Sequence, residues 1–83
     1  MGDTEGFVSM AMSVDGVRMA AFMKEADEGM WRISLRAEAG DVQTIAARYG
    51  GGGHRRAAGC DLEGEADEVA ARLAAELTAA LDE

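Results

Sequence analysis

The stretch GGGGHRRAAG, residues 50–59, decides how this chain is interpreted. Four consecutive glycines leave this backbone without Cβ atoms. The chain can therefore adopt positive φ, and another molecule can approach the amides closely. A histidine and two arginines follow at once. A plain turn would not need four glycines, because each one costs conformational entropy on folding. This composition indicates a loop that holds a phosphorylated, anionic ligand, and the alternative is a flexible turn after a helix end.

The residues before the glycines predict a short helix that ends at Gly50. Asp41 is a strong N-cap candidate. The apolar residues after it recur at helical spacing on one face, namely Val42, Ile45, Ala46 and Tyr49. Gly50 then ends the helix as a left-handed cap, and Tyr49 is expected in the core.

Three segments alternate apolar and polar residues as strands do. Residues 17–23 and 31–37 flank a polar turn at 25–29 and are expected to form an antiparallel hairpin. Trp31 continues the apolar face of the second strand, so core packing is favoured over base stacking. Residues 58–62 predict a third strand.

The two ends of the chain are expected to be helical. Asp3 and Thr4 are N-cap candidates for a short helix over residues 4–13, which a turn at Asp15-Gly16 would follow. Residues 65–81 predict a second terminal helix with acidic residues in its first turn. Its inward positions are Val69, Leu73, Leu77 and Leu81.

The resulting order is α-β-β-α-β-α, an α/β (α+β) fold with a small three-stranded mixed sheet. The length of 83 residues bounds the chain to a single domain, 1–83. The second strand, the middle helix and the third strand are expected to form a right-handed parallel crossover. In that arrangement Arg36 and the glycine run lie at opposite strand ends, some ~17 Å apart.

The net charge of −8 argues against nucleic-acid binding through bulk charge. Residues 32–56 nevertheless hold five arginines against Glu38 and Asp41, so this segment carries +3 and the remainder −11. A short basic segment in an otherwise acidic chain is better suited to a local phosphate site than to binding along a long polyanion. The alternative is that these arginines only lie on the surface of a strand and a loop and bind no ligand.

Several kinds of site and location are disfavoured by composition. Cys60 is the single cysteine and His54 the single histidine, which excludes a disulfide framework and makes a complete zinc site implausible. No apolar run approaches the ~20 residues of a membrane span, and no secretory signal pattern is visible. We therefore expect a cytoplasmic protein with no membrane partner.

Successive glycine amides can curl into a nest that cups an anion, and Gly51, Gly52 and Gly53 are placed to do so. His54 can add a hydrogen bond or a positive charge to a bound phosphate. The helix dipole before the loop opposes anion binding, so the amides and basic side chains must outweigh it. No Gly-Lys-Ser/Thr follows the glycines, which excludes a P-loop.

The motif Gly51-Gly-Gly-His-x-x-Ala-Ala-Gly59 resembles that of the DHH-associated domain, the substrate-binding lobe of DHH-family phosphoesterases. Ser34-Leu35-Arg36 and Asp41-Val42-x-x-Ile45-Ala46 are similar to the oligoribonuclease/pAp phosphatase branch, the nanoRNases. The segments Thr4-Glu5-Gly6 and Ser13–Val17 match that branch as well.

The resemblance implies a binding role without catalysis. In that family a separate DHH lobe holds two divalent metals, usually manganese, which activate water. The resemblance places substrate-binding residues at Gly51, Gly52, Gly53 and His54, with Arg36 and Ser34 from the upstream strand. Arg55 and Arg56 occupy variable positions, so they either rim the site or pair with the acidic body.

The chain has no Asp-His-His segment, so we assign it no catalytic or metal-binding residue and no cofactor. We expect one lobe of a longer protein that hydrolyses nothing alone. Its expected partners are the DHH catalytic domain and a phosphorylated nucleotide or short RNA, and a homodimer stays open. Three alternatives remain: the substrate lobe of a RecJ-type single-strand exonuclease, a stand-alone nucleotide-binding module, and a purely structural domain.

Overall fold

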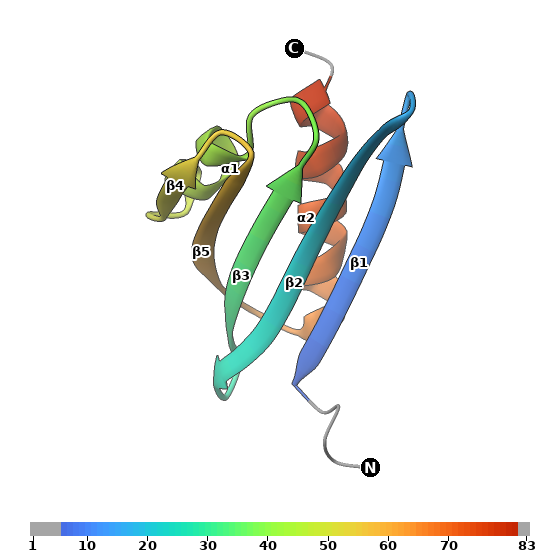
Figure 1. Cartoon of the computed structure of the whole chain (residues 1–83). Coiled ribbons are helices and arrows are strands. Elements are labelled where there is room, and N and C mark those ends of the chain that lie inside the picture. Colours follow the sequence, from blue (N-terminus) through green and yellow to red (C-terminus); the bar gives the residue numbers. More distant parts are fainter. Residues whose placement is uncertain (1–5, 82–83) are drawn as a thin grey trace.

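The computed structural model describes residues 6–81, which form one antiparallel sheet with two helices. The strands are β1 (Phe7–Val14), β2 (Val17–Asp27), β3 (Met30–Ala37), β4 (Gly52–His54) and β5 (Ala57–Glu63), and the helices are α1 (Val42–Arg48) and α2 (Ala66–Leu81). The strand order across the sheet is β1-β2-β3-β5-β4, and every neighbouring pair is antiparallel. Figure 1 shows both helices behind the sheet, on the same face.

The predicted helix over residues 4–13 is wrong for its described part, because β1 occupies this stretch. The apolar residues here also fit a period of two, and that period wins because it places Val8, Met10 and Met12 on the face that packs against the core. Asp3 and Thr4 lie outside the described residues. The predicted turn is confirmed, since Asp15 and Gly16 have φ of 52° and 81° between the paired residues Val14 and Val17.

The predicted three-stranded mixed sheet with a parallel crossover is also wrong. The chain leaves β3, forms α1, and returns through a short strand, β4, that pairs with β5 in a hairpin. This extra strand reverses the direction in which β5 runs, so β3 and β5 are antiparallel. Arg36 is consequently the register partner of Ala57, next to the glycine run and not ~17 Å from it.

The remaining elements confirm the sequence-based expectations. Strands β2 and β3 form the predicted antiparallel hairpin, and α1 begins after the N-cap Asp41. Helix α2 begins with acidic residues in its first turn. No helix among residues 6–81 is long and apolar enough to span a membrane.

The core lies between one face of the sheet and the two helices. Its buried hydrophobic residues are Met19, Ala21, Met23, Trp31, Ile33, Leu35, Val42, Ile45, Ala46, Ala58, Cys60, Leu62, Val69, Leu73 and Leu77. The predicted inward positions of α2 are confirmed for Val69, Leu73 and Leu77. The side chain of Leu81, the fourth predicted position, lies outside the described part. Trp31 is a core residue, as favoured, and its indole N–H donates to the carbonyl of Gly64 at 3.0 Å.

The opposite face of the sheet is not covered by either helix (Figure 1). The residues that alternate with the core positions point to this face, and we call it the open face. On β3 these residues are Arg32, Ser34 and Arg36, which are exposed or half-buried. The side-chain alternation of a strand therefore separates the predicted site residues from the core.

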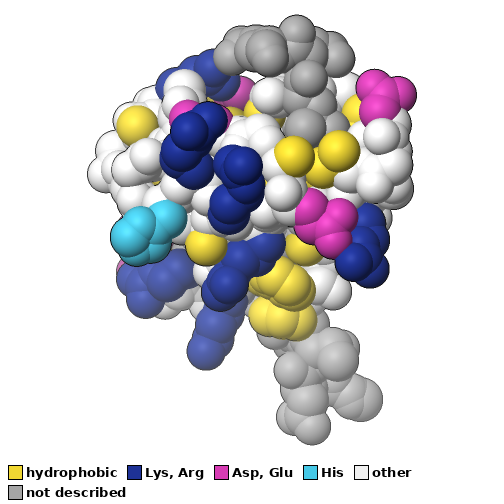
Figure 2. All heavy atoms as spheres, turned by 45° about the horizontal axis from the view of Figure 1, so that its top comes forward, with side chains coloured by type: hydrophobic (Ala, Val, Ile, Leu, Met, Phe, Trp, Pro, Cys, Tyr) yellow, Lys and Arg dark blue, Asp and Glu magenta, His cyan; other side chains and the backbone are white. Residues whose placement is uncertain are grey.

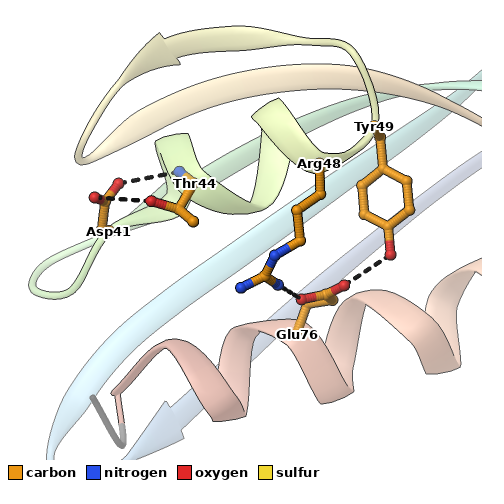
Figure 3. Close-up of polar contacts among 5 residues, drawn as sticks. All are labelled: Asp41, Thr44, Arg48, Tyr49 and Glu76. Atoms are coloured by element: carbon orange, nitrogen blue, oxygen red, sulfur yellow. Dashed lines mark hydrogen bonds and ion pairs between the residues drawn. The ribbon is translucent and has the colours of Figure 1, made fainter.

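A polar contact between the helices fixes the end of α1, where the glycine run begins. Figure 3 shows Glu76 of α2 between two residues from the end of α1. The Tyr49 hydroxyl donates to Glu76 Oε2 at 2.7 Å, and the Arg48 guanidinium pairs with Oε1. The hydrogen bond to Glu76 is the main cause that raises the pKa of Tyr49, with burial adding to it. Tyr49 also packs against the core, as expected.

We predict that Tyr49→Phe lowers the free energy of unfolding by about 1–2 kcal/mol, because Glu76 then loses a hydrogen bond while only 17% exposed. Urea denaturation measures this loss. Arg32→Gln is the control, because it removes an ion pair at the surface. Arg32 Nε and Asp61 Oδ1 lie 3.6 Å apart, and the two side chains are 69% and 56% exposed. Such a surface pair contributes less than about 0.5 kcal/mol. Equal destabilisation by both variants contradicts the role given to Glu76.

A second prediction concerns pH and the buried thiol. Burial is the main cause that raises the pKa of Cys60, and the charges of Asp61 and Glu76 add to it. As pH rises, the unfolded chain releases the thiol proton first, near a pKa of about 8.5, so the free energy of unfolding falls above this pH. Urea denaturation at pH 7.5 and 9.5 should show a smaller fall for Cys60→Ala. An identical fall in both proteins would contradict this assignment.

Candidate functional site

The first glycine of the run ends a helix. Gly50 has φ of 82°, in the left-handed region that glycine adopts readily. Its N–H donates to the carbonyl of Ala47 at 3.1 Å, and the N–H of Gly51 donates to Ala46 at 2.8 Å. This pair of bonds is a Schellman motif, and it confirms the predicted cap.

The next glycines allow two backbones to meet. A Cβ built on Gly51 would lie 2.0 Å from the carbonyl oxygen of Gly59. Gly53 has φ of 143°, and a Cβ there would lie 2.6 Å from the Cα of Ala58. A Cβ on Gly52 would meet nothing within 4 Å. Gly51 and Gly53 are therefore required by close packing against β5, whereas Gly52 faces open space.

The predicted amide nest is not formed. The N–H of Gly51 is occupied by the helix cap, and residues Gly52–His54 are an extended strand paired with β5. The glycines consequently shape a flat surface and do not curl around an anion. A ligand on this surface would be held chiefly by side chains.

The hairpin tip is anchored to two other elements. The carbonyl of Arg55 accepts from the N–H of Val42 at 2.8 Å, and that of Arg56 accepts from Ala37 at 3.1 Å. The amide of Gln43 donates to the carbonyl of Gly53 at 2.7 Å. Gln43 was not among the predicted site residues, because a single exposed glutamine on a helix gives no sequence signal. These bonds hold β4 against the start of α1.

The strand register gathers the predicted side chains on the open face. Arg36, Ala57 and His54 lie side by side on β3, β5 and β4. The neighbouring row consists of Ser34, Gly59 and Gly52. A shallow depression between these rows is lined by Ser34, Arg36, Gly52, Gly53, Ala57, Ala58 and Gly59. Strand β5 thus forms a floor of small residues between Arg36 and His54, which lie two strand spacings, ~10 Å, apart.

Pairing within the chain decides which basic groups are available. Arg32 faces Asp61, and Arg18 pairs with Glu38 at 2.7 Å. Within residues 6–81, neither Arg36 nor His54 makes a side-chain hydrogen bond or ion pair. Figure 2 shows Lys and Arg side chains gathered on this side of the molecule, with the single histidine beside them. A local positive surface therefore exists on a chain whose net charge is −8.

The two tip arginines differ. The Arg56 guanidinium donates to the carbonyl of Gly40, which ties it to the loop before α1. Arg55 is exposed at the tip, near Asp41. Desolvation opposes the charge of Asp41, but the backbone N–H and hydroxyl of Thr44 bind its carboxylate at 3.2 and 3.1 Å, and Arg55 adds attraction. The net result is a lowered pKa of Asp41, so this helix cap stays ionised (Figure 3).

A different depression lies at the other end of the sheet, lined by Gly6, Phe7 and residues 24–28. It carries the carboxylates of Glu25, Asp27 and Glu28 against Lys24, so its charge does not suit a phosphate. Among residues 6–81 no group of three His, Cys, Asp or Glu side chains is placed to hold a metal ion.

We predict that the glycines of the run differ in their tolerance of alanine. Gly51→Ala and Gly53→Ala should destabilise the fold by about 1–3 kcal/mol, because the new methyl group would overlap the backbone of β5. Gly52→Ala is the matched control and should fold with nearly unchanged stability. Thermal unfolding of the three variants makes the comparison. Equal effects at all three positions would contradict the described packing of β4 on β5.

Comparisons with known proteins identify the family of the chain. The chain matches the DHHA1 domain family over residues 1–83. It is 38% identical over 63 residues to the bifunctional oligoribonuclease and PAP phosphatase NrnA of Thermus thermophilus, covering 75% of this chain and 19% of that protein. It is 49% identical over 43 residues to the oligoribonuclease NrnB of Bacillus subtilis, covering 49% of this chain and 11% of that protein.

A third relative is the probable bifunctional oligoribonuclease and PAP phosphatase NrnA of Streptococcus mutans, which is 32% identical over 59 residues, 71% of this chain and 19% of that protein. The chain therefore spans about a fifth or less of the length of the curated relatives it matches. The family match over the whole chain, supported by these identities, shows that it belongs to the DHHA1 family of DHH-associated domains and is of the nanoRNase type.

Proposed function

We propose that the open face binds the phosphate of a nucleotide or short oligoribonucleotide, as the substrate-binding lobe of a DHH phosphoesterase. The observation that carries this proposal is the row of Arg36, Ala57 and His54, in which two basic side chains without anionic partners among residues 6–81 flank a floor of small residues. A phosphate over Ala57 could be approached from both sides. Ser34 would add a hydroxyl donor from the adjacent row.

The role of the glycines in this proposal is steric. Gly52 and Gly59 present no side chain to the open face, so a sugar-phosphate chain can lie close to the sheet. Gly51 and Gly53 hold β4 in place through close packing. Arg55 would rim the site from the hairpin tip without contacting the floor.

The names of the relatives support a substrate class for this proposal. Two of them carry names that combine an oligoribonuclease with a PAP phosphatase. We therefore assign this surface to short 5′-phosphorylated oligoribonucleotides and pAp. Hydrolysis and the two divalent ions, manganese in our proposal, would belong to a DHH catalytic domain with which this lobe works. The lobe would orient the nucleotide and leave bond cleavage to that domain.

A stand-alone nucleotide-binding module is the competing function. The two differ in affinity, because an open face contacts one side of a nucleotide, whereas tight small-molecule sites bury most of the ligand surface. Weak binding by this chain favours a lobe that needs a second surface. Tight binding would favour the stand-alone module.

The test is an amide-resolved NMR titration of the chain with pAp and with a 5′-phosphorylated diribonucleotide. We expect shifts at Gly52, His54 and Arg36, and at least about tenfold weaker binding for Arg36→Gln and for His54→Ala, since each removes a charge-assisted hydrogen bond.

Arg32→Gln is the matched control, because Arg32 lies two residues from Arg36 on the same face but faces Asp61. It should change affinity by less than about twofold, as expected of an exposed, paired charge. Loss of binding in all three variants to the same extent would indicate a general charge effect. Shifts that avoid the Arg36–His54 row would overturn the assignment.

A further inference from the structure

A second depression adjoins the proposed phosphate site and shares Arg36 with it. Its floor is made by Ala11 of β1 and Ala20 of β2, which are direct register partners, and Ala20 is in turn the partner of Arg36. We call it the alanine pocket. It continues the row of Arg36, Ala57 and His54 towards the other edge of the sheet, on the same open face.

Three arginines line the alanine pocket, and two of them have hydrogen-bond partners within the chain. The Arg18 side chain donates from Nε to Glu38 Oε2 at 2.9 Å, while its backbone N–H donates to Oε1 at 3.2 Å. The Arg56 guanidinium is bound to the carbonyl of Gly40. Arg36 alone has no side-chain partner among the described residues. Two of the three arginines thus have partners within the chain, and Arg36 is free to engage a phosphate.

The chemistry of the alanine pocket suits a flat, apolar group better than a second phosphate. Its floor offers methyl groups and no donor. The charge of Arg18 is already matched by Glu38, whose carboxylate would repel an anion. Guanidinium planes stack on nucleobases, and stacking tolerates any base because each one has a π-face. A nucleobase is flat, carries no negative charge and can stack on a guanidinium plane above a floor of methyl groups.

We propose that the alanine pocket binds a nucleobase of the oligonucleotide whose phosphate lies between Arg36 and His54. This assignment rests on the proposed function of the open face and adds a direction to it. The phosphate would lie over β3, β5 and β4, and the base over β1 and β2. The bound nucleotide chain would run across the strands, with Arg36 at the junction of the two subsites.

The experiment compares two probes with equal phosphate content: a 5′-phosphorylated diribonucleotide and its abasic counterpart. Ala11→Leu fills the alanine pocket, and because Ala11 is exposed on an edge strand the fold should tolerate leucine there. Ser9→Leu is the matched control, since Ser9 lies on the same strand and face but does not line the pocket. Ala20→Leu is a second filling variant on β2.

We expect Ala11→Leu to weaken the base-containing probe by about 5- to 150-fold, the range that one stacked base contributes, and to leave the abasic probe within about twofold. Ser9→Leu should change neither. Equal weakening of both probes would assign the alanine pocket to sugar-phosphate and overturn the proposal. Unchanged binding in both filling variants, or an equal effect of Ser9→Leu, would overturn it too.

The same titrations separate this inference from the function on which it rests. His54→Ala should weaken both probes, because it acts on the phosphate subsite. Loss in His54→Ala without any effect of filling the alanine pocket would leave the proposed function standing and remove the base subsite. Failure of both probes to bind the wild-type chain would overturn both assignments.

Discussion

The close approach of Gly51 to Gly59 is the constraint on which the arrangement of the open face depends. No Cβ fits between these backbones, because it would lie 2.0 Å from a carbonyl oxygen. This contact lets β4 pair with β5 directly after a helix end, so the chain reverses without a long loop. The reversal makes β5 antiparallel to β3 and places His54 across Ala57 from Arg36. A steric requirement at one backbone thus determines which side chains face each other.

Charge distribution adds a second level of selection. The chain is strongly acidic, yet ion pairs with Asp61 and Glu38 involve Arg32 and Arg18 and leave Arg36 without a partner among residues 6–81. Counting arginines in a segment therefore overstates the charge that a ligand would meet. The available charge is set by the cross-strand neighbours of each arginine, and these depend on register.

Sequence reasoning succeeded where the periodicity of side chains is strong. Helix α1 has a cap and a complete stripe, and β3 alternates cleanly around Trp31. It failed at β1, whose alanine and methionine residues fit both periods, because only pairing with β2 decides between them. It failed again at β4, since glycines carry no side-chain pattern. Because the prediction lacked β4, it joined the second and third strands by a parallel crossover. That crossover in turn gave the wrong distance between Arg36 and the glycine run.

The structure brings several of the predicted site residues together, but not in the predicted arrangement. Ser34, Arg36, Gly52 and His54 do share one face, but the glycine amides do not form a nest. A ligand on this face would meet side chains and a flat floor instead of the predicted nest of backbone N–H donors. Such a floor contacts only one side of a nucleotide, whereas sites that bind small ligands tightly enclose most of their surface. The geometry of the open face therefore favours a lobe that completes its site against another surface, with Arg36 central to both depressions that meet on it.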